Sequence, residues 1–390
     1  MTNGATSRQK LPATVVALGV TSFFADIGSE MIFPLLPVFV ASLGAGATFL
    51  GLVEGVADAT SSFLKLASGY VADRLPRKKP LVLFGYGIAA LARPLMAVAT
   101  APWHVLVIRS TDRIGKGIRS SPRDVLIASS VSGAESGRAF GFHRAMDHAG
   151  AVVGPILATV LLSFNVPLRT VFWLALVPGM LSVVAVATVR ETPIAPMMPT
   201  PPRAHPRPHL PRSLRWYLAI LVLFSLGNSS EAFLLLRAKD IGVPIHLIPL
   251  LWTTFHVVKL LSSYVGGAWS DRLPRQTLIV SGWMVFAVTY LAFGAATKPW
   301  HAWALFLVFG TYYGLTEPAE KALVRDLAPQ ELRGRAYGLY NFILGICAVP
   351  AGLMTGWLWQ TWNPFVALAS GAALAATASV ALMAWARASR

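Results

Sequence analysis

Apolar residues dominate this chain in long, nearly continuous runs, and short stretches rich in Gly, Pro, Lys and Arg separate them. A run of about 20 predominantly apolar residues is long enough to cross the hydrocarbon core of a bilayer as a helix. We therefore predict an all-α integral membrane protein with twelve transmembrane helices, at residues 13–41, 47–72, 80–101, 103–128, 138–163, 169–190, 214–237, 245–270, 276–297, 300–325, 335–359 and 363–387.

Composition supports the membrane interpretation. The 390 residues are 55% hydrophobic and 13% charged, whereas a soluble domain is about 25% charged. Too few polar residues exist to coat one large soluble core. The basic, then apolar, start of the chain continues too far for a cleaved signal peptide, so we predict a retained first span. The single Cys347 excludes an intrachain disulfide framework and a multi-Cys metal site.

An internal repeat divides the chain into two halves. The pentapeptide DRLPR occurs at 73–77 and again at 271–275, FFADIGSE near residue 23 matches LFSLGNSSE near 224, and SGRAFGFH at 136–143 matches RGRAYGLY at 333–340. A repeat of this size indicates two homologous units. We predict an N-terminal six-helix bundle at 1–190, a Pro- and Arg-rich linker at 191–213 and a C-terminal six-helix bundle at 214–390.

The net charge of +16 indicates how the protein is oriented in the membrane. Basic residues gather in the linker and in alternate loops, which hold Arg74, Arg77, Lys78, Lys79, Arg138, Arg272, Arg275, Arg333 and Arg335. The other loops hold little beyond Arg169, Arg237, Lys239 and Lys298. Loops rich in Lys and Arg stay in the cytoplasm. We therefore expect a multi-pass protein of the cell (inner) membrane with both termini and the linker cytoplasmic, and we attribute the charge to topology rather than to a nucleic acid partner.

One predicted span is unusually charged. The stretch IRSTDRIGKGIRSSPRD, residues 108–124, carries seven charged side chains. At about 100° per residue they fall within an arc of about 140°. A charge at the bilayer centre costs at least about 2.5–3.5 kcal/mol, so this face must meet acids, water or both. We predict Arg113 as the central charge of a pathway and Lys116 as its helper, and we interpret Arg119, Arg123 and Asp124 as interface anchors.

Polar residues in other spans supply partners for that face. Asp26, Glu30 or Asp112 is the expected counter-charge of Arg113. The full set that we assign to a substrate or proton pathway is Asp26, Glu30, Asp58, Arg109, Asp112, Arg113, Lys116, Asp147, Glu231, His256, Lys259, Glu317 and Glu320. Buried ion pairs that fix helix register are the alternative for any one of them. For the whole set, in both halves, a water-filled central pathway is favoured.

Three segments resemble a known family. GYVADRLPRKK, residues 69–79, resembles motif A of the major facilitator superfamily through Gly69, Asp73, Arg74, Arg77 and Lys78, with Pro76 where Gly is usual. GAWSDRLPRQ, 267–276, is a degenerate second copy. RIGKGIRSSP, 113–122, resembles motif B, with Lys116 where Gln is commonest. Gly141, Gly150, Gly154 and Pro155 have the spacing of motif C of proton-driven exporters, although Ala158 and Thr159 replace its trailing Gly pair.

The resemblance implies a major facilitator fold, with two pseudo-symmetric six-helix bundles around a site that opens to each side in turn. It implies a conformational latch made of Gly69, Asp73, Arg74, Arg77, Arg138, Asp271 and Arg272. It also favours export of a small organic solute in exchange for protons, with no cofactor beyond the proton gradient. Burial raises the pKa of an acid and a nearby cation lowers it, so Asp26 or Glu30 near Arg113 is the expected proton carrier. We expect a monomer in the lipid bilayer.

Other functions remain open at this stage. Uptake or exchange of an anionic solute would use Arg109, Arg113, Lys116 and Lys259 to bind carboxylate or phosphate. Efflux of a metal or an organic cation would use the acids and histidines, but no spacing such as H-x-x-x-H supports a metal site. An enzyme is disfavoured, because the chain has no serine nucleophile elbow, HExxH or phosphate-binding loop. A receptor or scaffold would not need so many charges in both halves.

Overall fold

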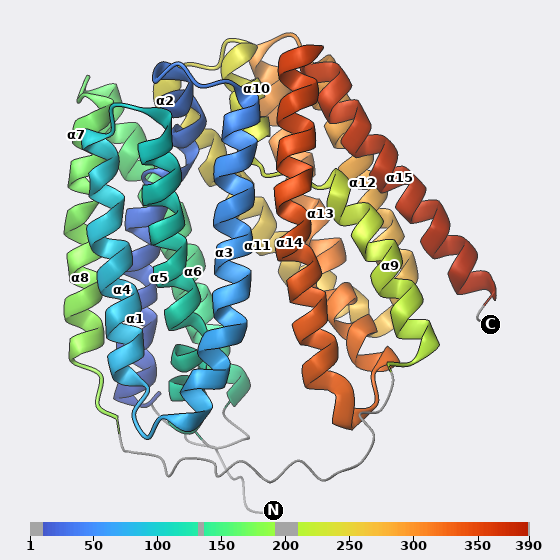
Figure 1. The fold of residues 1–390 in the computed structure, drawn as a ribbon, viewed down its shortest axis with the longest axis horizontal. Helices are drawn as coiled ribbons and strands as arrows, with labels where there is room; N and C mark the ends of the chain where they lie inside the picture. Colours follow the sequence, from blue (N-terminus) through green and yellow to red (C-terminus); the bar gives the residue numbers. More distant parts are fainter. Residues whose placement is uncertain (1–10, 132–135, 192–209, 389–390) are drawn as a thin grey trace, which may run out of the picture.

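A computed structural model describes residues 11–131, 136–191 and 210–388, and these residues contain helices and no strands (Figure 1). The elements of the first half are α1 (Ala13–Glu30), η1 (Phe33–Leu35), α2 (Leu36–Ser42), α3 (Ala47–Arg74), α4 (Lys79–Ala92), η2 (Arg93–Val98), α5 (Pro102–Ser129), α6 (Ser136–Ser163), α7 (Leu168–Leu174) and α8 (Leu176–Ala187). Those of the second half are α9 (Arg212–Gly227), α10 (Ala232–Asp240), η4 (Ile245–Leu247), α11 (Ile248–Arg272), α12 (Arg275–Ala295), α13 (Pro299–Leu327), η5 (Gln330–Leu332), α14 (Arg333–Thr361) and α15 (Pro364–Ala388).

The predicted all-α fold class is confirmed. Within the described ranges, nine helical segments are long and apolar enough to cross a membrane. The helices α3, α5 and α13 are similar in length, with 28, 28 and 29 residues, but they are more polar. For these three helices the crossing stays a prediction.

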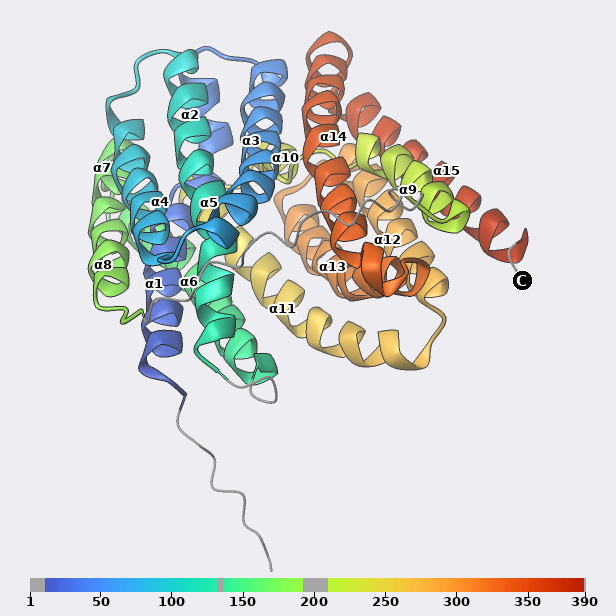
Figure 2. The same ribbon diagram turned by 60° about the horizontal axis from the view of Figure 1, so that its bottom comes forward.

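Helices α1–α8 and α9–α15 form two bundles that lie side by side (Figures 1 and 2). Their closest approach is between α3 and α14, where backbone touches backbone. A Cβ added at Gly51 would lie 2.0 Å from the carbonyl oxygen of Gly352, and one added at Gly352 would lie 2.5 Å from that of Gly51. Only glycine permits this contact, because any side chain would separate the helices.

The repeat is also visible in the way two helices begin. Both α5 and α13 start with the tripeptide PWH, at 102–104 and 299–301. The Nδ1 atom of His104 accepts hydrogen bonds from the backbone N–H groups of Thr100 (3.1 Å) and Ala101 (3.2 Å). The Nδ1 atom of His301 accepts them from Thr297 (3.1 Å) and Lys298 (3.3 Å). Each histidine therefore satisfies donors that a helix start leaves unpaired.

One face of the molecule carries both ends of the linker, and we name it the linker face; it is the lower edge in Figure 1. The carboxylate of Glu191, the last described residue before the linker, accepts hydrogen bonds from the backbone N–H groups of Lys78 (2.5 Å) and Lys79 (2.9 Å). These contacts place the loop after α3 on the linker face. Most of the predicted linker, residues 192–209, lies outside the described part of the chain, and the predicted domain boundaries stay predictions.

Candidate functional site

A cavity of about 660 Å³ lies between the two bundles, with walls from α1, α3, α5, α6, α11 and α14. Its deep end is marked by Glu30, the last residue of α1, and by His256 in the first half of α11. From there it extends to Asp124, Phe140 and Gly338, which lie near the helix ends on the linker face. The cavity therefore occupies the half of the molecule that is nearer the linker face.

The cavity wall is strongly charged. Six cationic side chains and four carboxylates line it, so positive charges exceed negative ones by two when histidine is counted as neutral. The cations are Lys65, Lys116, Arg119, Arg123, Arg144 and Lys259; the acids are Asp26, Glu30, Asp124 and Asp147; and the histidines are His143, His148 and His256. So many ionisable groups inside helices of membrane-spanning length indicate a polar pathway.

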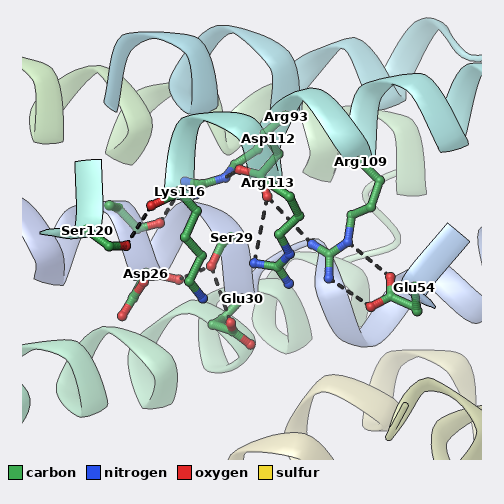
Figure 3. A network of polar contacts seen from close by, with 11 residues as sticks. Asp26, Ser29, Glu30, Glu54, Arg93, Arg109, Asp112, Arg113, Lys116 and Ser120 are labelled. Carbon is green, nitrogen blue, oxygen red and sulfur yellow. Dashed lines mark hydrogen bonds and ion pairs between the residues drawn. The ribbon is translucent and has the colours of Figure 1, made fainter. Parts of the chain in front are cut away.

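Six residues of the predicted pathway set reach this wall, namely Asp26, Glu30, Lys116, Asp147, His256 and Lys259. Figure 3 shows the side chain of Lys116 directed toward Asp26 and Glu30. Glu30 also links the two bundles. Its carboxylate accepts a hydrogen bond from Trp252 Nε1 on α11 at 2.8 Å, and His256 Nε2 lies 3.9 Å away. The sequence repeat alone gives no reason to expect this contact between halves.

Two glycines of the motif C-like segment place α1 against α6. A Cβ added at Gly150 would lie 2.4 Å from the carbonyl oxygen of Phe23 and 3.0 Å from Cβ of Asp26. A Cβ at Gly154 would lie 2.6 Å from the carbonyl oxygen of Ile27. These glycines therefore allow the close packing that positions Asp26 on the cavity wall. Gly141 has no such neighbour within 4 Å, and Pro155 lies inside α6.

A second group of charges is buried inside the first bundle, outside the cavity wall (Figure 3). Arg109 forms two hydrogen bonds with Glu54, at 3.0 and 3.1 Å. Asp112 accepts a hydrogen bond from Arg93 Nε at 2.7 Å and lies 3.7 Å from Arg109 Nη1. Arg113 Nη1 is 4.0 Å from the same carboxylate. This cluster agrees with the alternative interpretation of Arg109 and Asp112, in which buried ion pairs fix the register of the helices.

The structure thus does not bring the predicted central charge to the cavity wall. Arg113 lies between Lys116 of the wall and Arg109 of the buried cluster (Figure 3), and its Nε has no hydrogen-bond partner among the described residues. Asp58 is half-buried on α3 and also lies off the wall. A transport role for Arg109, Asp112, Arg113 and Asp58 stays a prediction.

The acids of the second bundle have different hydrogen-bond partners from those of the first. Glu320 is 5% exposed and accepts hydrogen bonds from Trp283 Nε1 (3.0 Å) and Tyr340 OH (2.7 Å). Glu231 accepts one from Tyr313 OH. Glu317 pairs with Lys321 at 2.7 Å. None of these three acids lies on the cavity wall that the described residues form, and their place in the pathway stays a prediction.

The predicted latch residues lie near the ends of α3 and α11 and at the start of α6. Arg74 contacts Tyr70, with its guanidinium 3.9 Å from the ring centroid. A Cβ added at Gly69 would lie 3.5 Å from Ser121. Arg77, Arg138 and Arg272 are exposed. The side chains of Asp73 and Asp271 fall outside the described part of the structure, so the latch stays a prediction.

Sequence reasoning missed part of the cavity wall. Arg119, interpreted as an interface anchor, is 4% exposed, lies 4.2 Å from the ring centroid of Tyr86 and faces the cavity. Arg123 and Asp124 also line it, and they pair with each other at 3.0 Å. Arg144 was not singled out, although it lies one helical turn from His148. The described residues contain no cluster of His, Cys, Asp and Glu that could hold a metal ion.

Comparisons with known proteins agree with the fold. The sequence profile of the Major Facilitator Superfamily matches residues 18–351. An uncharacterised MFS-type transporter of Methanocaldococcus jannaschii is 30% identical over 382 residues, which cover 96% of this chain and 95% of that protein. Multidrug resistance protein MdtH of Cronobacter sakazakii is 25% identical, covering 87% of this chain and 85% of its own length. The crystal structure of nucleoside transporter NupG superposes with a TM-score of 0.77 at 13% identity, covering 95% of this chain and 98% of that one.

Proposed function

The chain belongs to the major facilitator superfamily, a family of transporters and not of enzymes, and on that premise we propose that it moves a small organic solute through the cavity between its bundles by proton-coupled alternating access. It is a multi-pass membrane protein. We place it in the cell (inner) membrane with the linker and both termini in the cytoplasm, because the linker face carries the basic loops. A monomer suffices, since one chain supplies every wall of the cavity.

The observation that carries this proposal is the charged cavity between two repeated bundles. Transporters with internal repeats place their substrate sites at the interface of the repeats. Beyond the deep end of the cavity, contacts join the bundles: Trp252 with Glu30, Phe33 with Trp252 (ring centroids 5.0 Å apart), and Thr48 Oγ1 with Gln360 Oε1 (2.8 Å). The structure therefore fits one end state of the cycle, open toward the linker face.

Asp26 is the acid to which we assign the proton. Its carboxylate has no hydrogen-bond donor among the described residues, whereas Glu30 accepts bonds from Trp252 and Ser29. The charged groups that face Asp26 are Lys116 and Arg119 of α5, Glu30 of its own helix and Asp147 of α6. Protonation of Asp26 thus changes the charge that Lys116 meets across the cavity.

Export in exchange for protons is a second candidate within this activity. It is supported by the motif C-like glycines against α1 and by the similarity to proteins named multidrug resistance protein MdtH. Exchange requires a solute that competes with the proton for the same acid. A cationic or zwitterionic compound bound at Asp26 meets that requirement.

The test uses purified protein in proteoliposomes that contain a pH-sensitive dye. A pH gradient is imposed, and internal pH is followed after addition of pooled carboxylates, amines or neutral compounds. We expect at least one pool to move protons in vesicles with protein and not in empty ones. Asp26→Asn should abolish this movement, whereas Asp240→Asn, an exposed acid at the end of α10, should preserve it. Equal proton movement in folded Asp26→Asn protein contradicts the assignment to Asp26, and no pool moving protons contradicts proton coupling.

A further inference from the structure

We propose that the solute is an organic anion and that its carboxylate or phosphate group binds a triad of cations, Lys65, Lys116 and Arg119, on the wall formed by α3 and α5. This inference rests on the proposed function, because it names the substrate class of the same cavity.

Each of the three cations has N–H groups that no described residue accepts a hydrogen bond from, although Arg119 also lies over the ring of Tyr86. The ammonium groups of Lys65 and Lys116 form no hydrogen bond or close ion pair with any described residue, although both line the cavity. Arg119 is 4% exposed, and its Nε and Nη1 atoms are buried without a hydrogen-bond partner in the described structure. A buried donor without a partner costs free energy, so a bound oxyanion would satisfy groups that the protein leaves unsatisfied.

Three neighbouring cations, Arg123, Lys259 and Arg109, are engaged elsewhere, whereas Arg144, the remaining cation of the wall, is exposed. Arg123 is paired with Asp124. Lys259 Nζ lies 3.6 Å from the ring centroid of Tyr313. Arg109, which the sequence suggested as an anion ligand, donates from two of its nitrogens to Glu54 away from the cavity. The anion site is therefore built from two residues that the sequence did not assign to it, Lys65 and Arg119, together with Lys116.

Electrostatic repulsion within the triad points to the same ligand. Lys116 experiences the positive charges of Lys65 and Arg119, and both lysines experience that of Arg113, which lies behind the wall. Like charges in a medium of low dielectric repel strongly, and Asp26 and Glu30 supply only part of the opposing charge. An anion removes the repulsion, whereas a cationic solute would add to it.

Apolar side chains near the mouth favour an organic anion over an inorganic one. Leu66 on α3 and Phe342 on α14 line the cavity from opposite bundles, and they are 59% and 40% exposed. Phe140 lines it from α6. A solute with an apolar body and one anionic group would bury these surfaces while its charged end meets the triad.

The position of Asp26 opposite Lys116 also predicts whether the proton and the solute move in the same direction or in opposite directions. A proton on Asp26 removes the negative charge that competes with the solute for Lys116, so proton and anion each favour binding of the other. They would then cross the membrane together. An anionic solute therefore predicts co-transport, the opposite of the exchange expected from the motif C-like segment.

The experiment compares probes with one apolar body and different charge. Benzoate, phenyl phosphate, benzyltrimethylammonium and benzyl alcohol are titrated into purified protein in nanodiscs at constant ionic strength, with inorganic phosphate as a further probe. Calorimetry and thermal shift report binding. We expect benzoate or phenyl phosphate to bind more tightly than the cation, the alcohol and inorganic phosphate, with proton uptake on binding. Lys116→Gln and Lys65→Gln should each weaken anion binding about tenfold or more.

Lys298→Gln is the matched control, because it removes the same charge from an exposed residue before α13 and should leave anion binding unchanged. Three results would overturn the inference: tighter binding of benzyltrimethylammonium, anion binding unaffected by both lysine substitutions in folded protein, or no anion binding at millimolar concentration. If the anions bind but no pH-dependent flux occurs, the proposed function fails and the anion site stands. If a cation or neutral compound moves protons and the anions do not bind, the anion site fails and the proposed function stands.

Discussion

Helices α5 and α13 occupy equivalent places in the two halves, but the side chains that they direct into their bundles differ in chemistry. Both begin with PWH, and counting from that tripeptide pairs Gly117 with Gly314. Both glycines permit tight packing: an added Cβ would lie 2.5 Å from Cβ of Leu64 in one case and 2.3 Å from the carbonyl oxygen of Ser262 in the other. The same count pairs Arg109, Asp112 and Lys116 with Phe306, Phe309 and Tyr313.

The backbone packing of the repeat is thus kept while the side-chain chemistry differs. In the first bundle, ions satisfy one another, as Arg109 does with Glu54. In the second, rings fill the same space, and Phe309 stacks on Phe255 with centroids 5.6 Å apart. The acid Glu320 is held there by neutral donors. The comparison indicates that helix positions depend on the glycine contacts, whereas the charge of the cavity depends on one half far more than on the other.

The largest effect should come from breaking the buried ion pair. Arg109→Ala leaves Glu54 charged and unpaired, and the loss of one partner of a buried pair costs about 3–5 kcal/mol. The double substitution Arg109→Met with Glu54→Leu should recover much of that loss, because it removes both charges. Free energies of unfolding in detergent for the two single variants and the double variant measure this. A loss below about 1 kcal/mol for Arg109→Ala would remove the contrast between the halves.

A smaller effect is expected at Glu320 in the second bundle. Glu320→Leu leaves the Trp283 and Tyr340 donors without their acceptor, which should cost about 1–3 kcal/mol. Glu320→Gln keeps a carbonyl acceptor and should cost less. The same unfolding assay compares them. Equal losses for the two variants would mean that the negative charge matters in this bundle, as it does in the first, and not merely the hydrogen bonds.

The smallest effect should be at the helix starts, where the two halves are alike. His104→Ala and His301→Ala each remove an acceptor for two backbone N–H groups. Loss of such a cap costs about 0.5–2 kcal/mol. Because the geometry is nearly the same, the two losses should agree. A marked difference in thermal stability between the two single variants would show that the repeat is not equivalent even at the caps.

Part of the site was predictable and part was not. Asp26, Glu30 and Lys116 were identified because charged residues stand out in apolar spans, and they do reach the cavity wall. The depth and motif spacing of Arg113 predict a central charge, but depth does not specify which neighbour a side chain meets. No sequence pattern predicts a role for Arg93, a lone arginine in an apolar run, yet it forms the 2.7 Å contact with Asp112.

The sequence by itself determined the helical membrane class, the two-fold repeat and the family. The length of apolar runs, the repeated segments and the spacing of motif residues can all be seen in the linear sequence, without knowing which helices are neighbours. Only the tertiary structure decided which charges neutralise each other. Glu54 and Arg109 are 55 residues apart, and Glu30 and Trp252 are 222 apart. A helical pattern fixes the face on which a side chain lies, but the neighbouring helix decides whether it meets an acid, a ring or the cavity. For that reason the excess of cations on the cavity wall emerges only when six helices from both halves are brought together.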